Sequence, residues 1–452
     1  MSEWPNLISC LQKGRGRGRV VATRDHALAL DEFEHASSLA PDLKRLRGRS
    51  VLLSVRDMAK VAAALIDLDG CARRILLVPP GWESRRLEAA ASDAEADAIV
   101  HDDEDASTPT SVDLTVACRL PLQPVSSPRI ANLETEWILP TSGTTGAPKL
   151  VRHTLRTLIG AIGEAPSQQW ATFYDIRRYG GLQIFLRALS GRGSLTLGAQ
   201  GEGLSSLLAR FGDAKITHIS GTPTHWRKVL MSGEGLRIDP EYVRLSGEIA
   251  DEGVLAALHK LYSRARIEHA YASTEAGVVF AVDDGRAGFP ASWVERNGAV
   301  RMKIVDGALH VRSGRSALGF LGEGAPALTD NEGFVDTGDM VEGRGDRYYF
   351  VGRRGGIINV GGAKVHPEEV ETALNAHAIV RASRVFARTS PITGALVFAD
   401  VVLRDGCLPD AASEGDILAA CRASLPAYMV PAGLRFVADL PMTDGGKLAR
   451  HG

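Results

Sequence analysis

Cysteine is scarce in this sequence, and the few cysteines present form no metal-binding or disulfide pattern. There are five, an odd number, far apart and without any C-x-x-C pair: Cys10, Cys71, Cys118, Cys407 and Cys421. A zinc site or a disulfide framework is therefore not expected. Because such cysteine usage is typical of a reducing compartment, we predict a cytoplasmic location.

A charge imbalance and long apolar runs are missing as well. The 52 Lys and Arg residues nearly balance the 54 Asp and Glu residues, which leaves a formal net charge of -2. This balance gives no electrostatic reason to expect nucleic acid or a membrane surface as a partner. No apolar run approaches the roughly 20 residues that a transmembrane helix needs. The first residues, MSEWPNLISCLQKGRGRG, also lack the charged-then-apolar order of a signal peptide.

The sequence does contain a repeated alternation of short apolar strands with helical patterns. SVLLSV (50–55) precedes a helical segment at 58–70, ILLVPP (75–80) follows, and a second helical segment leads to AIVHDD (98–103). This order predicts an α/β fold with parallel sheets and helices on their faces. The order returns around three later strands: 215–220, 243–247 and 266–271. The length of 452 residues favours two or three domains.

Hairpins replace this alternation from about Gly298 onward. Asp306-Gly307 lies between two alternating runs and predicts a tight two-residue turn. A second hairpin is expected to turn within 343–346. The sequence therefore changes from parallel to antiparallel strands in this region.

The C-terminal part has the composition of a small, separate domain. Segment 352–362 contains five glycines and is the predicted boundary. We expect a large N-terminal domain over 1–354 and an α+β domain over 355–452. Ser413 is the predicted N-cap of a helix within the small domain.

The stretch LPTSGTTGAPKL (139–150) has the composition of a phosphate-binding loop. Glycines let backbone N–H groups point toward an anion, hydroxyls add donors, and Lys149 adds a mobile positive charge. The stretch does not match the Walker A pattern, because Lys149 follows Gly146 by three residues with Pro148 between them. It does not match G-x-G-x-x-G either, since no glycine stands two residues after Gly143. A polar surface turn is the alternative for this loop taken alone.

Five segments, in order along the chain, resemble the motifs of the adenylate-forming superfamily. This superfamily includes acyl-CoA synthetases, the adenylation domains of peptide synthetases, and luciferases. The segments are TSGTTGAPKLVRHT (141–154), YASTEAG (271–277), FVDTGDM (334–340), GRRGGIINVGGAKVHPEEVE (352–371) and PMTDGGKLAR (441–450). Each motif alone is moderately specific, whereas five in the family's order are not expected by chance. The resemblance begins at about residue 45.

The resemblance implies both a fold and a two-step reaction. The expected fold is α/β: a large N-terminal domain with parallel-type β/α sheets plus a distorted β-barrel, and a small mobile α+β C-terminal domain. The implied reaction joins a small carboxylic acid to ATP, which gives an acyl-adenylate and pyrophosphate, and then transfers the acyl group to a thiol. The implied cofactors are ATP, Mg²⁺, and CoA or the phosphopantetheine of an acyl carrier protein.

The resemblance also assigns residues to the phosphates of ATP. Thr144 and Thr145, with the backbone of Gly143 and Gly146, are expected to hold the β- and γ-phosphates, and Lys149 to assist. Thr141 and Ser142 complete this predicted loop.

The aromatic-x-x-Thr-Glu segment is expected to serve the α-phosphate, the metal and the base. Thr274 would bond the α-phosphate, and Glu275 would ligate Mg²⁺, which prefers carboxylate and phosphate oxygen. Tyr271 would stack on adenine, with Gly247 and Glu248 on the opposite wall. The alternatives are a capping pair at the start of a helix for Thr-Glu, and a core aromatic for Tyr271.

The Thr-Gly-Asp segment is expected to serve the ribose, and the terminal segment is expected to supply the catalytic lysine. Asp339 is expected to accept hydrogen bonds from the ribose hydroxyls, supported by Arg353, although a surface turn would also explain Thr-Gly-Asp. Lys447 is the predicted catalytic residue for adenylate formation. A lysine in a Gly-Gly-Lys turn is otherwise solvated.

The hinge motif departs from the family at Gly355, where relatives usually carry Asp or Lys. Glycine keeps rotation possible but lacks a side chain that favours one orientation. Lys364 is expected to contact phosphate, and Gly361 and Gly362 to line a tunnel for the pantetheine arm.

A second departure lies in FYDIRRYGGLQIF (173–185), where relatives usually have His two residues before a glycine pair and this chain has Arg178. A cation there could bind a second acidic or polar group of the substrate, or Arg177 and Arg178 are solvated charges at a helix start. A competing alignment makes Asp175 an amine-binding aspartate. The predicted substrate pocket consists of Arg178, Tyr179, Gly180, Gly221 and Thr222, with His225 expected to be structural.

Three functions remain open at this point. The leading prediction is an acid–thiol ligase that makes an acyl-CoA. One alternative is an enzyme that loads an acyl or amino acid onto a carrier protein, and another is a non-catalytic nucleotide- or acyl-binding homologue. The presence of every key motif residue favours an enzyme.

Overall fold

The computed structural model describes residues 6–11, 17–102, 108–125, 131–141, 149–159, 167–360, 363–390 and 394–441. Their contacts divide the chain into two compact units. The first unit contains 1–250, 256–285 and 311–335, and the second contains 251–255, 286–310 and 336–452. Ser142, Gly143, Thr144, Thr145, Gly146, Gly361, Gly362 and Lys447 lie outside the described residues. The predicted domain boundary after residue 354 stays a prediction.

One sheet of the first unit has seven strands in the order β20-β10-β9-β5-β4-β6-β7. The strands from β9 to β7 run parallel, and β10 and β20 are antiparallel to their neighbours. The bounds are β4 Ser50–Ser54, β5 Arg74–Leu77, β6 Ala98–His101, β7 Leu114–Ala117, β9 Glu136–Thr141, β10 Lys149–Thr154 and β20 Gly319–Leu321. The predicted strand–helix–strand order in this region is confirmed.

A second sheet has eight strands in the order β16-β15-β14-β13-β11-β12-β1-β2. The five strands from β12 to β15 are parallel, and β16 closes the sheet antiparallel to β15. The bounds are β1 Val20–Ala22, β2 Ala27–Ala29, β11 Gln169–Thr172, β12 Ser194–Leu197, β13 His218–Gly221, β14 Tyr242–Ser246, β15 Arg266–Ser273 and β16 Gly277–Val282. The carboxyl ends of β11, β13, β14 and β15 therefore meet at one edge.

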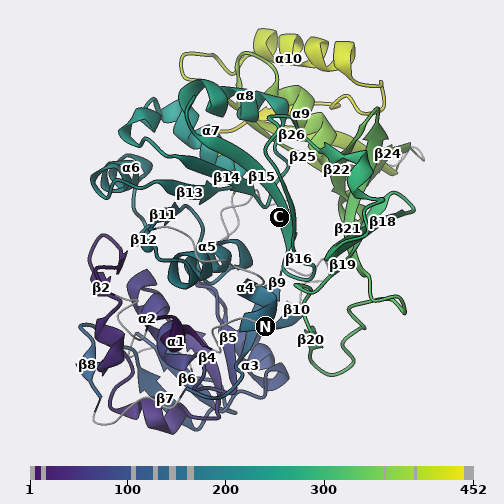
Figure 1. The fold of residues 1–452 in the computed structure, drawn as a ribbon. Coiled ribbons are helices and arrows are strands. Elements are labelled where there is room, and N and C mark those ends of the chain that lie inside the picture. The colour runs from purple at the N-terminus through teal and green to yellow at the C-terminus, as the bar shows by residue number, and fades with distance from the viewer. Residues whose placement is uncertain are drawn as a thin grey trace. The chain divides into compact units, whose positions relative to one another are not determined.

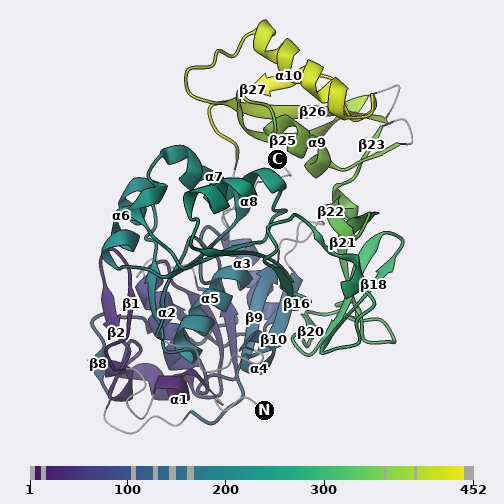
Figure 2. The ribbon, with the colours of Figure 1, turned by 45° about the horizontal axis from the view of Figure 1, so that its top comes forward.

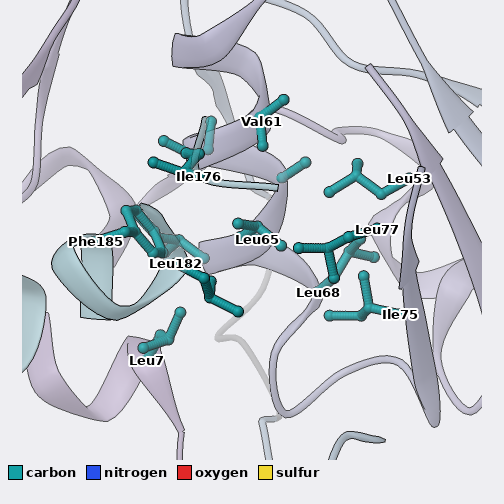
Figure 3. Packing of buried hydrophobic residues seen from close by; sticks show 14 of the residues in the cluster. Leu7, Leu53, Val61, Leu65, Leu68, Ile75, Leu77, Ile176, Leu182 and Phe185 are labelled. Atoms are coloured by element: carbon teal, nitrogen blue, oxygen red, sulfur yellow. The ribbon is translucent and has the colours of Figure 1, made fainter. Parts of the chain in front are cut away.

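Two buried helices, α2 (Met58–Leu68) and α5 (Tyr179–Ser190), fill the space between these sheets (Figure 1). Figure 3 shows Val61, Leu65 and Leu68 of α2 between strand residues such as Leu53 and side chains of α5. Helix α2 is buried on nearly its whole surface because nine of its 11 residues are apolar and the carboxylate of its buried Asp67 accepts hydrogen bonds from Ser37 and Ser38. Asp57 begins it, since its carboxylate accepts a hydrogen bond from the Lys60 N–H.

Of the other helices before residue 262, α1 precedes the first strand and the rest lie between strands in the predicted alternation. Their bounds are α1 Leu7–Leu11, α3 Ser84–Asp93, α4 Leu155–Ile159, α6 Leu204–Asp213, α7 Pro223–Ser232 and α8 Glu252–Leu261. A two-stranded sheet joins β3 (Ala36–Ser37) to β8 (Gln123–Pro124). No helix among the described residues is both long and apolar enough to cross a membrane.

A five-stranded sheet with the order β17-β22-β21-β19-β18 takes the place of the expected β-barrel as a half-barrel. Its bounds are β17 Phe289–Pro290, β18 Val300–Val305, β19 Ala308–Ser313, β21 Val335–Arg344 and β22 Arg347–Arg353. Asp306 and Gly307 both have positive φ, 51° and 76°, as the predicted tight turn requires. Arg344 pairs with Arg347, so the second hairpin turns at Gly345-Asp346, inside the predicted range.

The C-terminal residues form the predicted α+β arrangement. Figure 2 shows α9 (Pro367–Asn375) and α10 (Ala411–Ser424) beside the sheet of β25, β26 and β27. The strand bounds are β23 Ile358–Val360, β24 Ala363–Val365, β25 Val380–Ser390, β26 Gly394–Leu403 and β27 Leu434–Phe436. The prediction of Ser413 as N-cap is wrong, because Asp410 precedes the helix and its carboxylate accepts from the Ser413 N–H.

Candidate active site

The phosphate-loop motif is flanked by two antiparallel strands of one hairpin. Thr141 at the end of β9 pairs with Lys149 at the start of β10. In a Walker loop the lysine instead begins a helix, so the structure agrees with the mismatch seen in the sequence. Lys149 is exposed, with its Nζ 5.3 Å from the centre of the Phe320 ring. The phosphate contacts assigned to Ser142–Gly146 stay predictions.

The Thr-Glu motif forms the connection between the antiparallel strands β15 and β16. Since a strand follows it, the alternative of a capping pair at a helix start is wrong. The Ala317 N–H donates to the Glu275 carbonyl (2.9 Å), and the Ala276 N–H donates to Ser273 Oγ (3.0 Å). Among the described residues, no hydrogen bond or ion pair involves the side chain of Thr274 or Glu275. The backbone of the turn is therefore held while both side chains remain available for a ligand.

His153 connects the strand that follows the phosphate loop to the Thr-Glu turn. Its Nε2–H donates to the Thr274 carbonyl at 2.7 Å, and its Nδ1 lies 2.8 Å from Thr157 Oγ1. A carbonyl only accepts, so the bond fixes the tautomer with the proton on Nε2. His153 is fully buried, and burial lowers its pKa to about 4. The sequence motif contained this histidine, but its role in positioning was not predicted.

The buried, neutral state of His153 predicts a defined pH dependence of stability. Its folded-state pKa of about 4 lies below the unfolded value of about 6.5. The unfolded chain therefore binds more protons between these values, and the free energy of unfolding falls as pH drops from about 6.5 to about 4, by on the order of 1–3 kcal/mol. His153→Gln keeps an N–H donor without the titration. We expect the stability advantage of the wild type over this variant to shrink from pH 7.5 to pH 5 in thermal melts.

The wild type and His153→Gln share all other titrating groups, so the contributions of those groups to the pH dependence of stability cancel in this comparison. His153→Leu, which removes the donor to the Thr274 carbonyl, should be less stable than His153→Gln at pH 7.5. A wild-type advantage that stays constant across this pH range would contradict the assignment.

Gly277 is required at the end of the Thr-Glu turn. Its φ is +77°, and a Cβ there would overlap the Arg315 carbonyl oxygen. Gly277→Ala should therefore lower the free energy of unfolding by about 1–3 kcal/mol from backbone strain alone and displace Thr274 and Glu275. Chemical denaturation measures the loss. Gly314→Ala, in the same part of the chain with open space around it, is the control and should change little.

The residues expected around adenine lie at the carboxyl ends of adjacent parallel strands. Ser246 pairs with Ala270, so Gly247 and Tyr271 follow at neighbouring positions. Tyr271 is half-buried, with its ring 5.5 Å from that of Phe280. Glu248 Oε2 accepts from the Thr224 N–H at 2.9 Å, and Gly247 has a φ of +87° that favours glycine. Such an edge is where ligands bind in open α/β sheets.

The predicted substrate-pocket residues lie after β11 and at or just after the end of β13, at the same edge, and their contacts with a substrate stay predictions. Thr222 is the N-cap of α7 and forms a capping box with His225, whose pKa burial lowers to about 4, so His225 is structural as predicted. A Cβ on Gly221 would lie 2.7 Å from the Phe173 ring. Tyr179 is buried at the start of α5. A Cβ on Gly180 would lie 3.7 Å from the Tyr174 ring, which is ordinary van der Waals contact.

The pair Arg177 and Asp175 is a buried structural ion pair. Arg177 is 4% exposed and donates to both Asp175 oxygens and to the Val55 carbonyl (2.6 Å), so its description as a solvated charge is wrong. These bonds occupy both oxygens of Asp175, which disfavours its use as an amine-binding aspartate. Arg178 is the N-cap residue of α5 and is half-buried. Its substrate contact stays a prediction.

In the second unit, Asp339 and Arg353 face each other on β21 and β22. Arg353 Nε donates to Asp339 Oδ1 at 2.8 Å, and the Asp339 side chain is 13% exposed. Thr337 Oγ1 donates to the Leu309 carbonyl and accepts from the Asp339 N–H. Thr-Gly-Asp is thus part of a strand, and the surface-turn alternative is wrong. Its contact with ribose stays a prediction.

The remaining predicted residues lie around the hinge motif. Gly355 belongs to a short 3-10 helix, Arg354–Gly356, and is exposed. Lys364 is exposed on β24. The roles of these residues, and those of Gly361, Gly362 and Lys447, stay predictions.

Sequence profiles decide the family. The profile of the AMP-binding enzymes matches residues 35–314. The chain belongs to the AMP-binding enzyme family. The profile of the AMP-binding enzyme C-terminal domain matches residues 369–447, so both parts of the AMP-binding architecture are present.

Individual AMP-binding relatives are distant. An isonitrile lipopeptide synthase of Streptomyces coeruleorubidus is 29% identical and covers 70% of this chain and 23% of its own length. An acetyl-coenzyme A synthetase of Xylella fastidiosa is 24% identical and covers 70% and 55%. The chain thus spans about half the length, or less, of these two relatives. An anthranilate CoA ligase structure with anthranoyl-AMP has a TM-score of 0.83 at 18% identity, covering 98% and 95%. This likeness confirms the predicted fold.

Proposed function

We propose that this protein activates a small carboxylic acid with ATP and transfers the acyl group to the thiol of CoA. The observation that carries the proposal is the bond from His153 to the Thr274 carbonyl, which ties the strand after the phosphate-loop motif to the Thr-Glu turn. Two motifs whose bonded residues are 121 positions apart are thus joined by one hydrogen bond in the first unit. Phosphate and metal ligands need such fixed placement, because adenylation depends chiefly on alignment and charge neutralisation.

The reaction needs two steps because a carboxylate is anionic and has no usable leaving group. In the first, the carboxylate attacks the α-phosphorus of ATP and pyrophosphate leaves. In this step Thr274 donates to the α-phosphate, the loop motif holds the β- and γ-phosphates, and Lys447 neutralises the approaching anions. In the second step the thiol displaces AMP. Asp339, held by Arg353, orients the ribose.

Glu275 fits the metal that this family uses. Among the described residues, no group of three His, Cys, Asp or Glu side chains forms a protein-only metal site. Mg²⁺ in nucleotide enzymes is commonly bound by one or two carboxylates together with substrate phosphates. Glu275 matches this pattern, because the described residues give its carboxylate no partner and its turn is bonded to β10, the strand after the loop. When bound, the ion supplies charge neutralisation at the phosphates. Glu275 would bind it through its carboxylate.

Carboxylic-acid-dependent exchange of radiolabelled pyrophosphate into ATP tests the first step. We expect exchange with at least one member of a panel of aliphatic and aromatic acids, and none without an acid. A chain that binds ATP but supports no exchange across the panel would favour the non-catalytic alternative.

Mass spectrometry of the products tests the acceptor. Relatives named as CoA synthetases or ligases support CoA, whereas the lipopeptide synthase supports a carrier protein. We expect an acyl-CoA when CoA and a holo carrier protein are supplied separately. Acylation of the carrier alone would contradict the choice of CoA and leave the adenylation step intact.

A further inference from the structure

One face of helix α5 carries a line of three polar side chains, the last of which is a cation that the proposed reaction does not use. Tyr179, Gln183 and Arg187 are four residues apart, so they lie on the same face of the helix. The Tyr179 ring lies 5.8 Å from the ring of His153, which bonds the Thr274 carbonyl. Arg187 is two turns further along, about 12 Å from Tyr179 at the helical rise. The line therefore leads away from the predicted α-phosphate position.

Arg315 meets this face from a segment attached to the Thr-Glu turn. Its Nη2 donates to Gln183 Oε1 (2.8 Å) and to the Leu158 carbonyl (2.7 Å). Two residues later, Ala317 bonds the Glu275 carbonyl. Both acceptors of Arg315 are neutral, so its charge is hydrogen-bonded but has no carboxylate partner among the described residues. Its pKa is lowered, by burial first and by the nearby Arg244.

The carboxylate that acts on this cluster belongs to Glu268, and it already pairs with Arg244. Arg244 on β14 is buried and forms an ion pair with Glu268 on β15. Glu268 also accepts from the Tyr242 hydroxyl (2.6 Å) and from Arg266 (3.3 Å). Both oxygens of the Glu268 carboxylate therefore already have partners in Arg244, Tyr242 and Arg266.

Among the residues that the structure describes, Arg187 is the member of the cluster without a hydrogen-bond or ion-pair partner. It is half-buried, and the described part of the chain gives its guanidinium no hydrogen bond and no ion pair. The charges that act on it are those of Arg244 and Arg315 against the single carboxylate of Glu268, and Tyr242 adds a hydroxyl. Burial, followed by Arg244, lowers the Arg187 pKa to about 10. Three buried or half-buried guanidinium groups thus face one carboxylate.

Such an arrangement is costly unless an anion completes it. Cations removed from water are normally paired, because the loss of hydration is not otherwise offset. Arg187 also lies in the last turn of α5, where the helix dipole favours a cation. That effect is worth only about 0.3–1 kcal/mol, and it explains neither Arg244 nor Arg315.

We propose that the acid activated by this protein carries a second anionic group, a carboxylate, which binds to Arg187 within the cluster of Arg187, Arg244 and Arg315. This inference rests on the proposed function and adds the substrate class. The reacting carboxylate lies by Thr274, and the second one on the order of 10 Å away along α5. Arg187 determines substrate specificity, whereas Arg244 and Arg315 position it electrostatically. The cation that selects the second group is therefore Arg187, two turns beyond Arg178.

Matched acids test the proposal. Each pair consists of a straight-chain or aromatic dicarboxylic acid, with carboxyl groups on the order of 10 Å apart, and its mono-methyl ester. We expect pyrophosphate exchange by the wild type to favour the diacid. Arg187→Gln should raise the KM of the diacid about 10–100-fold, with little change in kcat and none for the ester, as for a lost hydrogen bond to a charged group. Arg187→Lys should lie between.

The control is Arg156→Gln, the same change at an exposed arginine of α4, which should leave both acids unaffected. An ester-to-diacid ratio that is unchanged in Arg187→Gln, or a wild-type preference for the ester, overturns the proposal while exchange itself supports the function. Calorimetric binding of the same diacid without ATP is the second measurement. If no acid supports exchange, the proposed function fails. In that case calorimetry still tests the anion site, and equal affinity of the diacid for the wild type, Arg187→Lys and Arg187→Gln overturns it.

Discussion

Lys447→Ala is expected to abolish acyl-adenylate formation while thioester formation from a supplied acyl-adenylate continues. The reason is electrostatic: two anions, the carboxylate and the α-phosphate, must approach each other, and a single cation between them lowers that barrier. Loss of one such group typically costs about 10²–10³ in kcat. In the second step the thiol attacks the uncharged carbonyl carbon of the acyl-adenylate, so that step needs no such cation. Pyrophosphate exchange measures the first step, and release of AMP from synthetic acyl-adenylate with CoA measures the second.

The prediction depends on the match of PMTDGGKLAR to the terminal motif, since Lys447 lies outside the described residues. The family's C-terminal profile extends to residue 447 and so includes this lysine. Arg450→Ala removes a neighbouring positive charge from the same segment and serves as the control, with both half-reactions near wild type. An equal loss of both half-reactions in Lys447→Ala would show that this lysine does not act in adenylation.

The sequence predicts the order and kind of most elements because local chemistry decides them. Asp306-Gly307 adopts the positive φ values of a two-residue hairpin turn, and the apolar segment 58–70 becomes a helix buried on nearly all sides. The N-cap of α10 was assigned incorrectly for an equally local reason. Asp410 and Ser413 are both good caps, and only the backbone geometry distinguishes them: Asp410 is extended, whereas Ser413 is helical.

Side-chain partners across the fold are harder to predict from sequence. His153 bonds a carbonyl 121 positions away, because β10 and the Thr274 turn come together in space. Arg177 reads as one of two surface charges before a helix, yet it is buried against Asp175 and the Val55 carbonyl. The pairing of Arg244 with Glu268 follows from the register of β14 and β15, which the sequence pattern does not contain. The motifs can therefore be located from the sequence, whereas the side-chain contacts between elements become apparent only in the folded structure.

The same distinction separates the parts of the candidate site. Gly247 and Tyr271 become neighbours because parallel strands end at one edge, which the strand–helix alternation already implies. The reason for the glycine at position 277 appears only in the structure, where the Arg315 carbonyl occupies the space of a side chain. The rigid Thr-Glu turn results from such contacts, and its side chains are left available.

Glu275→Gln is expected to reduce kcat/KM for ATP about 10²-fold and to raise the Mg²⁺ concentration needed for half-maximal exchange. The substitution keeps the size of the side chain and removes only its negative charge, which a hard cation requires of its ligand. Because the described residues give the Glu275 carboxylate no hydrogen bond or ion pair, the folded protein should not depend on it. The melting temperature without ligands should therefore stay close to that of the wild type.

Metal titrations separate a ligand from a general electrostatic effect. If Glu275 holds the ion, high Mg²⁺ should restore much of the lost rate, and Thr274→Ala, which keeps the carboxylate, should lose rate without a change in the Mg²⁺ requirement. Glu323→Gln removes a charge from an exposed position of the same unit and should match the wild type in both measures. A Mg²⁺ requirement that is unchanged in Glu275→Gln would place the ion on the phosphates alone. The fixed backbone of the turn would then serve Thr274, and the carboxylate of Glu275 would have no part in binding the metal.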